Sequence, residues 1–372
     1  MSSAELARYS RHLALREIGV VGQEKLKAAK VLVIGVGGLG SPSILYLAAA
    51  GVGTIGIVDF DRVDVSNLQR QVLFATADVA QLKTQAALQR LSALNPDIKV
   101  IAHQVKLCAS NVREIFDSYD VVLDGTDRFG TRYLTNDACV ILGKPLVSAA
   151  VHRFEGQTMT YVPGHGPCYR CLFPEPPADG LVPNCAEAGV LGVLPGVLGT
   201  IQATEAIKLI VGFGEPLVGR LLTYDAMDMR FAEFQFTRRD DCAVCGIKPT
   251  ITELQDAPEL CSAEMLQHVL HLSPRDLQAR LDDPTLLLVD VREPHEYRGG
   301  FLPESINVPV AQLATRLDEL PANRMPVFIC RSGARSLTAC AIASRAGLQS
   351  VAHLEGGLLA WAKEVNCLPP EL

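Results

Sequence analysis

The strongest constraint on this chain comes from residues 31–40, with the sequence VLVIGVGGLG. Four apolar residues predict a buried parallel strand, and the glycine cluster after them predicts a tight turn. Ser41 and Pro42 suit the start of a helix, as its N-cap and first turn, and Gly51 suits the helix end. Because residues 54–58 again have strand character, the segment predicts a βαβ unit.

Such a unit indicates a nucleotide-binding site. Gly35, Gly37 and Gly40 form a G-x-G-x-x-G turn that lets backbone N–H groups approach phosphates. Asp59 ends the second strand, where an acidic residue holds a ribose hydroxyl. The motif alone fits NAD(P) or FAD as well as ATP. Residues 31–58 are also uncharged and long enough for a membrane span, but their glycines, proline and strand-then-helix pattern argue against one.

Composition narrows the classes of function. The 372 residues suffice for two domains, and a net charge of −7 without a basic block argues against direct binding of nucleic acid. The first residues lack the pattern of a secretory signal, so we expect a soluble, cytoplasmic protein. In that setting, 11 cysteines indicate metal ligation and thiol chemistry rather than a disulfide framework.

Further polar residues shift the prediction toward ATP. Asp61, Ser66, Asn67 and Arg70 follow the second strand, Lys83 lies on a helix predicted over residues 80–94, and Asp127 follows a strand predicted over 120–123. Arginine and lysine match the oxygens of a triphosphate, and a carboxylate suits Mg²⁺. A dehydrogenase has little use for this set.

These motifs give the first part of the chain a specific resemblance. GVGGLG (35–40), DFD (59–61), SNLQRQ (66–71) and Thr126-Asp127 resemble the MoeB/ThiF group of E1-like adenylating enzymes, from about Arg8 to Cys245. The resemblance implies a Rossmann-like α/β fold over residues 1–246. It also implies ATP-dependent adenylation of the C-terminal Gly-Gly of a small ubiquitin-like sulfur carrier protein.

The resemblance also implies roles for single residues. Gly38 and Asp59 would bind the nucleotide, and Asp127 would help to hold Mg²⁺. The phosphates would be gripped by Asn67, Arg70 and Lys83. Arg11 matches an arginine that reaches the ATP site of a partner subunit, which implies a homodimer. Many relatives have asparagine after the Thr-Asp pair, whereas this chain has Arg128.

Two cysteine pairs predict a metal site. Cys168 and Cys171 form one C-x-x-C motif, and Cys242 and Cys245 form another. Four thiolates make a closed tetrahedral Zn²⁺ site with a structural role, here joining distant segments. The alternative is two redox-active pairs.

Cys185 lies outside these pairs. From the residues alone, a buried cysteine without a chemical role is favoured. The position of Cys185, however, matches the thioester or acyl-disulfide cysteine proposed for relatives.

A second α/β domain is predicted over residues 269–372, after a linker at 247–268. Ser273-Pro274 starts a helix, residues 286–291 and 326–329 are strands, and a helix follows over 336–346. Cys330 lies between the second strand and that helix, in a loop that stabilises a thiolate or persulfide anion. A phosphatase loop is the rival, but it has five residues between cysteine and arginine, and here four separate Cys330 from Arg335.

The second domain resembles a rhodanese domain. The resemblance rests on the 330–335 loop together with DVREP (290–294), INVP (306–309) and LEGG (354–357), although GFLPE replaces the frequent GHIPG. It implies that Cys330 carries a persulfide, loaded by a cysteine desulfurase or thiosulfate, and that Arg335 belongs to the anion cradle. Together the two domains resemble MoeZ-like adenylyltransferase/sulfurtransferases. The alternatives are an NAD(P)-dependent oxidoreductase with a rhodanese appendage and a non-catalytic docking scaffold for a ubiquitin-like protein.

Overall fold

The computed structural model describes residues 1–176, 189–256, 269–321 and 323–365. They form two compact units, the first within residues 1–256 and the second within residues 269–365. The first unit includes the start of the predicted linker, since Ile251 and Leu254 pack against its core and Asp256 accepts a hydrogen bond from the Ala109 backbone.

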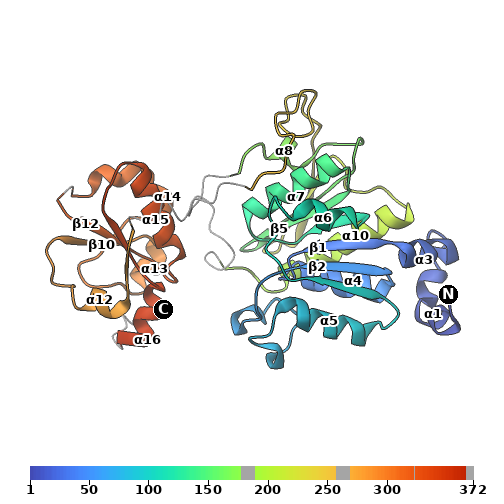
Figure 1. Cartoon of the computed structure of the whole chain (residues 1–372), viewed down its shortest axis with the longest axis horizontal. Coiled ribbons are helices and arrows are strands. Elements are labelled where there is room, and N and C mark those ends of the chain that lie inside the picture. Colours follow the sequence, from blue (N-terminus) through green and yellow to red (C-terminus); the bar gives the residue numbers. More distant parts are fainter. Residues whose placement is uncertain (177–188, 257–268, 322, 366–372) are drawn as a thin grey trace. The chain divides into compact units, whose positions relative to one another are not determined.

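The first unit is built on an eight-stranded sheet with the order β3-β2-β1-β4-β5-β6-β7-β8 (Figure 1). The first five strands in this order are parallel, and each pair from β5 to β8 is antiparallel. The strands are β1 (Lys30–Ile34), β2 (Thr54–Val58), β3 (Lys99–His103), β4 (Val121–Asp124), β5 (Leu146–His152), β6 (Glu155–Tyr161), β7 (Arg220–Asp225) and β8 (Arg230–Gln235).

Helices cover both faces of this sheet. Along β1, Val31 and Val33 pack in a core with α3, α4, α5 and α10, whereas Leu32 and Ile34 pack in another core with α6 and α7. The predicted α/β class is therefore confirmed. The helices are α1 (Ser3–Arg8), α2 (Ser10–Leu13), α3 (Gly19–Ala28), α4 (Gly40–Ala50), α5 (Lys83–Leu94), α6 (Val112–Asp117), α7 (Phe129–Leu142), α8 (Tyr169–Leu172) and α10 (Leu194–Val211), with 3₁₀ turns at Val65–Asn67 and Thr76–Asp78.

The glycine turn joins β1 to α4 as predicted, but the start of the helix differs. The expected N-cap, Ser41, lies inside the first turn, and the helix begins at Gly40 with no side-chain cap. The physical reason is that the turn itself continues into the helix, because the Ser41 N–H donates to the Gly37 carbonyl over 2.9 Å. At the other end, Gly51 stops the helix in a left-handed conformation with φ 82°, as expected.

Another predicted helix is shorter in the structure: α5 begins at Lys83 rather than at Ala80. Ala80 has a φ of 71°, a left-handed conformation that a helix cannot contain. Lys83 consequently occupies the first position of α5.

One described helix, α10, is long and apolar enough to cross a membrane, but half of its residues are buried inside the fold. It packs against α4, β5 and β6. Its apolar composition is therefore explained by its place in the core. The uncharged segment 31–58 forms a strand, a helix and a strand, which overturns the membrane-span alternative.

The second unit is a five-stranded, all-parallel sheet with the order β11-β10-β12-β13-β9 (Figure 1). Helices α14 and α15 pack on one face, and α12 and α16 pack on the other. Its elements are β9 (Val269–Leu272), α12 (Pro274–Gln278), β10 (Leu286–Asp290), α13 (Pro294–Arg298), β11 (Ile306–Asn307), α14 (Val310–Arg316), a 3₁₀ turn at Leu317–Glu319, β12 (Met325–Ile329), α15 (Ala334–Arg345), β13 (Val351–Leu354) and α16 (Gly357–Val365).

The predicted helix start at Ser273 is confirmed. Its hydroxyl accepts a hydrogen bond from the Asp276 backbone, and the Asp276 carboxylate accepts one from the Ser273 backbone. This reciprocal capping box satisfies two backbone donors that a helix terminus leaves open.

A tight contact in the first sheet gives a test of the fold. A Cβ atom on Gly56 of β2 would lie 2.2 Å from the Tyr119 hydroxyl oxygen, so Gly56→Ala forces a buried ring to move. We expect a loss of about 1–3 kcal/mol, seen as a lower thermal midpoint of the first unit. Gly196→Ala is the control, because a Cβ there meets no atom within 4 Å and alanine favours the helix. Equal midpoints for the two variants would contradict this account.

Candidate functional site

The first candidate site lies at the carboxyl ends of β1, β2 and β4, beside the glycine turn. Asp59 follows β2, and its carboxylate accepts hydrogen bonds of 2.8 Å from the backbone N–H groups of Val36 and Asp61. Burial raises the pKa of Asp59, and the charge of Lys83 opposes that rise. The carboxylate therefore fastens the glycine turn to the end of β2.

Lys83 is buried at the start of α5 and forms an ion pair of 3.2 Å with the Asp61 carboxylate. Its ammonium group thus pairs with the Asp61 carboxylate, and its charge also acts on the carboxylate of Asp59. A buried lysine that already neutralises acidic neighbours is held in one place, which suits a cation that contacts phosphates.

Neighbouring atoms of the fold approach the glycine turn so closely that side chains would clash there. Gly35 has a φ of 85°, and a Cβ on Gly40 would lie 2.0 Å from the Gly35 carbonyl oxygen. A Cβ on Gly38 would meet Pro195 of α10 at 3.1 Å and the Arg70 side chain at 3.5 Å. This close backbone approach beside an arginine fits a polyphosphate, and hence ATP.

The segment from Ser66 to Arg70 forms one side of this cradle. Ser66 is exposed, Asn67 is half-buried in the 3₁₀ turn, and the Arg70 guanidinium donates to the Ser66 carbonyl over 3.0 Å. That bond orients the arginine side chain, whose Cγ lies near the Gly38 position. The structure thus brings Arg70 to the glycine turn.

Two charged residues that the sequence analysis did not single out, Asp124 and Arg132, hold the end of β4. The Asp124 carboxylate accepts hydrogen bonds from the Thr126 backbone and hydroxyl, and it pairs with Arg132 at 3.2 Å. Arg132 also donates to the Thr126 carbonyl over 2.7 Å. Both charged side chains are buried, so this pair sets the shape of the loop that presents Asp127.

Asp127 and Arg128 are exposed after that loop. The Arg128 guanidinium lies 5.1 Å from the centre of the Phe60 ring, which joins the β4 loop to the segment after β2. Arg11 is exposed on α2, and no contact in the structure joins it to these residues. The structure brings the other predicted nucleotide ligands to one edge of the sheet.

The four predicted metal ligands do come together. The sulfurs of Cys168 and Cys242 are 3.6 Å apart, those of Cys171 and Cys245 are 3.3 Å apart, and all four lie within 4.8 Å of one another. Four sulfurs around a zinc ion at about 2.3 Å stand roughly 3.8 Å apart, so the cluster fits tetrahedral Zn²⁺. Hydrogen bonds with Cys171 and Cys245, together with burial, raise the pKa of the Cys168 thiol.

The second candidate site lies where β12 ends. Cys330 is fully buried, and its sulfur accepts hydrogen bonds from the backbone N–H groups of Gly333 at 3.1 Å and Ser336 at 3.4 Å. Gly333 adopts a φ of 94° as the N-cap of α15, which turns its N–H toward the sulfur. Donors at the positive end of a helix stabilise a thiolate or a persulfide.

The arginine of this loop is oriented by an acidic residue. Arg335 is buried and donates to both Glu296 carboxylate oxygens, over 2.6 and 2.9 Å. Partial burial opposes the effect, but hydrogen bonds from Arg335 and the Glu293 backbone lower the pKa of Glu296 overall. Asp290 and Arg292 form a second, fully buried pair at 2.7 Å, and Arg292 also donates to the Gly300 carbonyl. The Arg335–Glu296 pair joins the segment after β10 to the loop of Cys330, and the Asp290–Arg292 pair holds that segment in shape.

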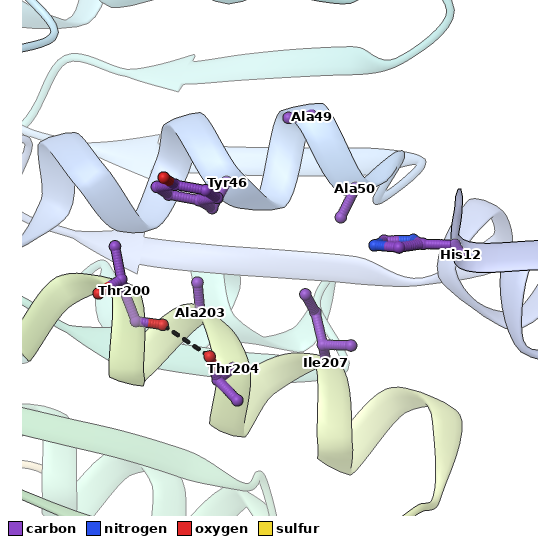
Figure 2. A pocket seen from close by; sticks show the side chains of 8 residues that line it. All are labelled: His12, Tyr46, Ala49, Ala50, Thr200, Ala203, Thr204 and Ile207. Atoms are coloured by element: carbon purple, nitrogen blue, oxygen red, sulfur yellow. Dashed lines mark hydrogen bonds between the residues drawn. The ribbon is translucent and has the colours of Figure 1, made fainter. Parts of the chain in front are cut away.

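A separate hollow lies on the first unit. Figure 2 shows it between α4 and α10, with His12 of α2 at one end. Its volume is about 430 Å³, and its lining is His12, Tyr46, Ala49, Ala50, Thr200, Ala203, Thr204 and Ile207. None of the predicted site residues lines it.

Cys185 lies outside the described residues.

Sequence reasoning missed Arg132, Glu296 and His353, a hydrogen-bond partner of Ser336. Arg132 had a local signal, since it stands eight positions after Asp124 at the start of a helix, and Glu296 is the N3 residue of a capping box that starts at Glu293. His353, which lies 3.3 Å from the Ser336 hydroxyl oxygen, comes from β13 and had none.

Comparisons with known proteins identify the family of each unit. Residues 9–244 match the ThiF family, and residues 273–364 match the rhodanese-like domain. The probable adenylyltransferase/sulfurtransferase MoeZ of Mycobacterium tuberculosis is 46% identical, over 98% of this chain and 95% of its own length. The adenylyltransferase and sulfurtransferase MOCS3 of Aedes aegypti is 41% identical over 98% of this chain and 89% of its own length.

Relatives of the first unit alone are also similar. A sulfur carrier protein adenylyltransferase of Thermus thermophilus is 52% identical, over 69% of this chain and 97% of its own length. Among solved structures, MccB of E. coli with ATP superposes with a TM-score of 0.56 at 26% identity, over 64% of this chain and 74% of that one. The chain therefore belongs to the ThiF family and, like the adenylyltransferase/sulfurtransferases that it resembles, continues into a rhodanese-like domain.

Proposed function

We propose that the protein adenylates the C-terminal Gly-Gly of a small ubiquitin-like sulfur carrier protein and then converts the adenylate to a thiocarboxylate with sulfur held on Cys330. The observation that carries the proposal is that both domains match adenylyltransferase/sulfurtransferase relatives over nearly the whole chain. An oxidoreductase with a rhodanese appendage and a non-catalytic docking scaffold are not favoured, because the relatives that match nearly the whole chain are named adenylyltransferase and sulfurtransferase.

The first step activates a carboxylate that is a poor acyl donor. The terminal carboxylate of the carrier attacks the α-phosphate of ATP, the bond to the β-phosphate breaks, and pyrophosphate leaves with the electron pair. Lys83 and Arg70 neutralise phosphate charge, and Mg²⁺ held with the help of Asp127 supplies further neutralisation. The glycine turn and Asp59 orient the nucleotide. No general base is needed, since the nucleophile is already ionised.

The second step uses the persulfide of Cys330. Its terminal sulfur attacks the carbonyl of the adenylate, AMP leaves, and an acyl disulfide links the carrier to Cys330. A thiolate, which we assign to Cys185, then attacks the Cys330 sulfur and releases the thiocarboxylate as a Cys185–Cys330 disulfide forms. A cysteine desulfurase or thiosulfate supplies the sulfur. The backbone donors of Gly333 and Ser336 and the Arg335–Glu296 pair support the anionic cysteine.

We further infer a homodimer, in which Arg11 of one subunit completes the ATP site of the other. We also infer a cytoplasmic location.

Zn²⁺ in the four-cysteine cluster is assigned a structural role, because all four ligand positions are filled by protein sulfur. It joins the segment around α8 to the turn after β8.

Exchange of labelled pyrophosphate into ATP tests the two-step scheme. We expect exchange that requires a Gly-Gly-tailed carrier, about a 10²-fold or greater loss in Asp127→Ala, and normal exchange in Cys330→Ser, which makes no thiocarboxylate. Cys108→Ser is the control for cysteine replacement and should support both reactions. Loss of exchange in a folded Cys330→Ser variant would contradict the division of labour between the domains.

Mixing two inactive variants tests the role of Arg11. In a mixed dimer of Arg11→Ala and Asp127→Ala, one site has an intact Asp127 and receives an intact Arg11 from the other subunit. Random mixing should therefore restore about one quarter of the wild-type exchange rate. If Arg11 served its own subunit, mixing would restore nothing.

Removal of one sulfur ligand tests the metal site. Cys168→Ser should lower bound zinc from about one ion per chain to near zero and lower the thermal midpoint of the first unit, since metal binding is coupled to folding. Cys108→Ser, at a half-exposed cysteine outside the cluster, should keep its zinc. Elemental analysis after gel filtration measures the content; full zinc occupancy in Cys168→Ser would contradict the assignment.

A further inference from the structure

A line of hydrogen-bonding groups runs from the Cys330 sulfur to the far edge of the second sheet. The sulfur lies 3.6 Å from the Ser336 hydroxyl oxygen, and that oxygen lies 3.3 Å from Nδ1 of His353. Nε2 of His353 lies 2.9 Å from Nδ1 of His271. Four polar side chains, three of them fully or almost fully buried, are thus linked in series.

The topology of the sheet creates this line. His353 on β13 and His271 on β9 are register partners in a parallel pair, which places both side chains on the same face. Their rings meet edge to face with centroids 4.7 Å apart. Ser336 lies in the first turn of α15, directly after the loop of Cys330. Its hydroxyl therefore faces His353, the buried member of the histidine pair.

The line of side chains runs from the core of the second unit to its surface. Cys330 and Ser336 are 0% exposed and His353 is 2% exposed, whereas His271 is exposed on the edge strand β9. Burial and the neighbouring His271 lower the pKa of His353 to about 4, so at neutral pH its ring is uncharged and has one nitrogen free to accept a proton. The two histidines therefore connect a buried thiol with the surface.

We propose that Ser336, His353 and His271 form a proton relay that carries the proton of the Cys330 thiol to solvent while a sulfane-sulfur donor loads the cysteine. The proposal rests on the proposed function of Cys330 as the sulfur acceptor. It adds three residues to the loop motif, two of them from strands that are remote from it in the sequence.

The relay moves one proton from the Cys330 thiol to water while the cysteine takes up the sulfur. The Cys330 thiol gives its proton to Ser336, the serine proton passes to Nδ1 of His353, the proton on Nε2 passes to Nδ1 of His271, and His271 releases one to water. The serine hydroxyl also donates to the Gly333 carbonyl, over 2.9 Å, and rotates to reach His353. With thiosulfate, the thiolate attacks the outer sulfur, a new S–S bond forms, and sulfite leaves with the electrons of the old one.

Single-turnover loading of the full-length protein with thiosulfate labelled in the outer sulfur tests the relay. Ser336→Ala is the most specific variant, because it removes the relay hydroxyl and keeps the backbone N–H that donates to the Cys330 sulfur. We expect Ser336→Ala and His353→Gln to load about 10²-fold more slowly and to lose the solvent deuterium isotope effect of the wild type. His271→Ala should be partly rescued by imidazole, since its site is exposed.

The controls separate the relay from the proposed function. His295→Gln replaces an exposed histidine of the same domain outside the line and should load normally. Wild-type rates in Ser336→Ala and His353→Gln, with Cys330→Ser inactive, would overturn the relay alone. So would slow loading that keeps the wild-type isotope effect, because that indicates a structural role. Loading of Cys330→Ser at the wild-type rate would overturn the proposed function and the relay together.

Discussion

The first unit depends on one contact between backbones. Gly40 begins α4 so close to the Gly35 carbonyl that a Cβ atom there would lie 2.0 Å from the oxygen. This closeness brings the helix N-terminus directly over the end of β1, and the Asp59 carboxylate ties the turn to β2 through the Val36 N–H. The atoms that fix the strand–turn–helix geometry are also those that we propose contact the phosphates, so in the proposed function folding and nucleotide binding share a single constraint.

The second unit contains a similar strand–loop–helix arrangement around Cys330. Again a buried parallel strand, β12, runs through a short loop into a helix, and a glycine with positive φ turns backbone N–H groups toward one point. In the first unit the proposed ligand at this point is a nucleotide, whereas in the second the sulfur of Cys330 itself accepts the backbone hydrogen bonds. In the proposed function, one arrangement stabilises phosphate charge and the other stabilises a sulfur anion.

The parts of both sites that could be predicted are those encoded locally. The glycine turn, the acid after β2, the paired C-x-x-C motifs and the Cys330 loop each depend on residues a few positions apart. Ser41 was misplaced because its capping preference competes with a turn that already continues into the helix. His353 and His271 lie 82 positions apart and meet only through the register of β13 and β9, which no local pattern reveals.

Buried charge explains why the Cys330 loop keeps its shape. Asp290 and Arg292 are each about 1% exposed, and Arg335 pairs with Glu296 beside them. Buried ion pairs add little net stability, but removing one partner leaves a costly unpaired charge, so alternative loop conformations are penalised. A persulfide must present one reactive sulfur in one direction. The domain therefore uses paired charges to restrict the loop, and this leaves the backbone donors of Gly333 and Ser336 to stabilise the anion.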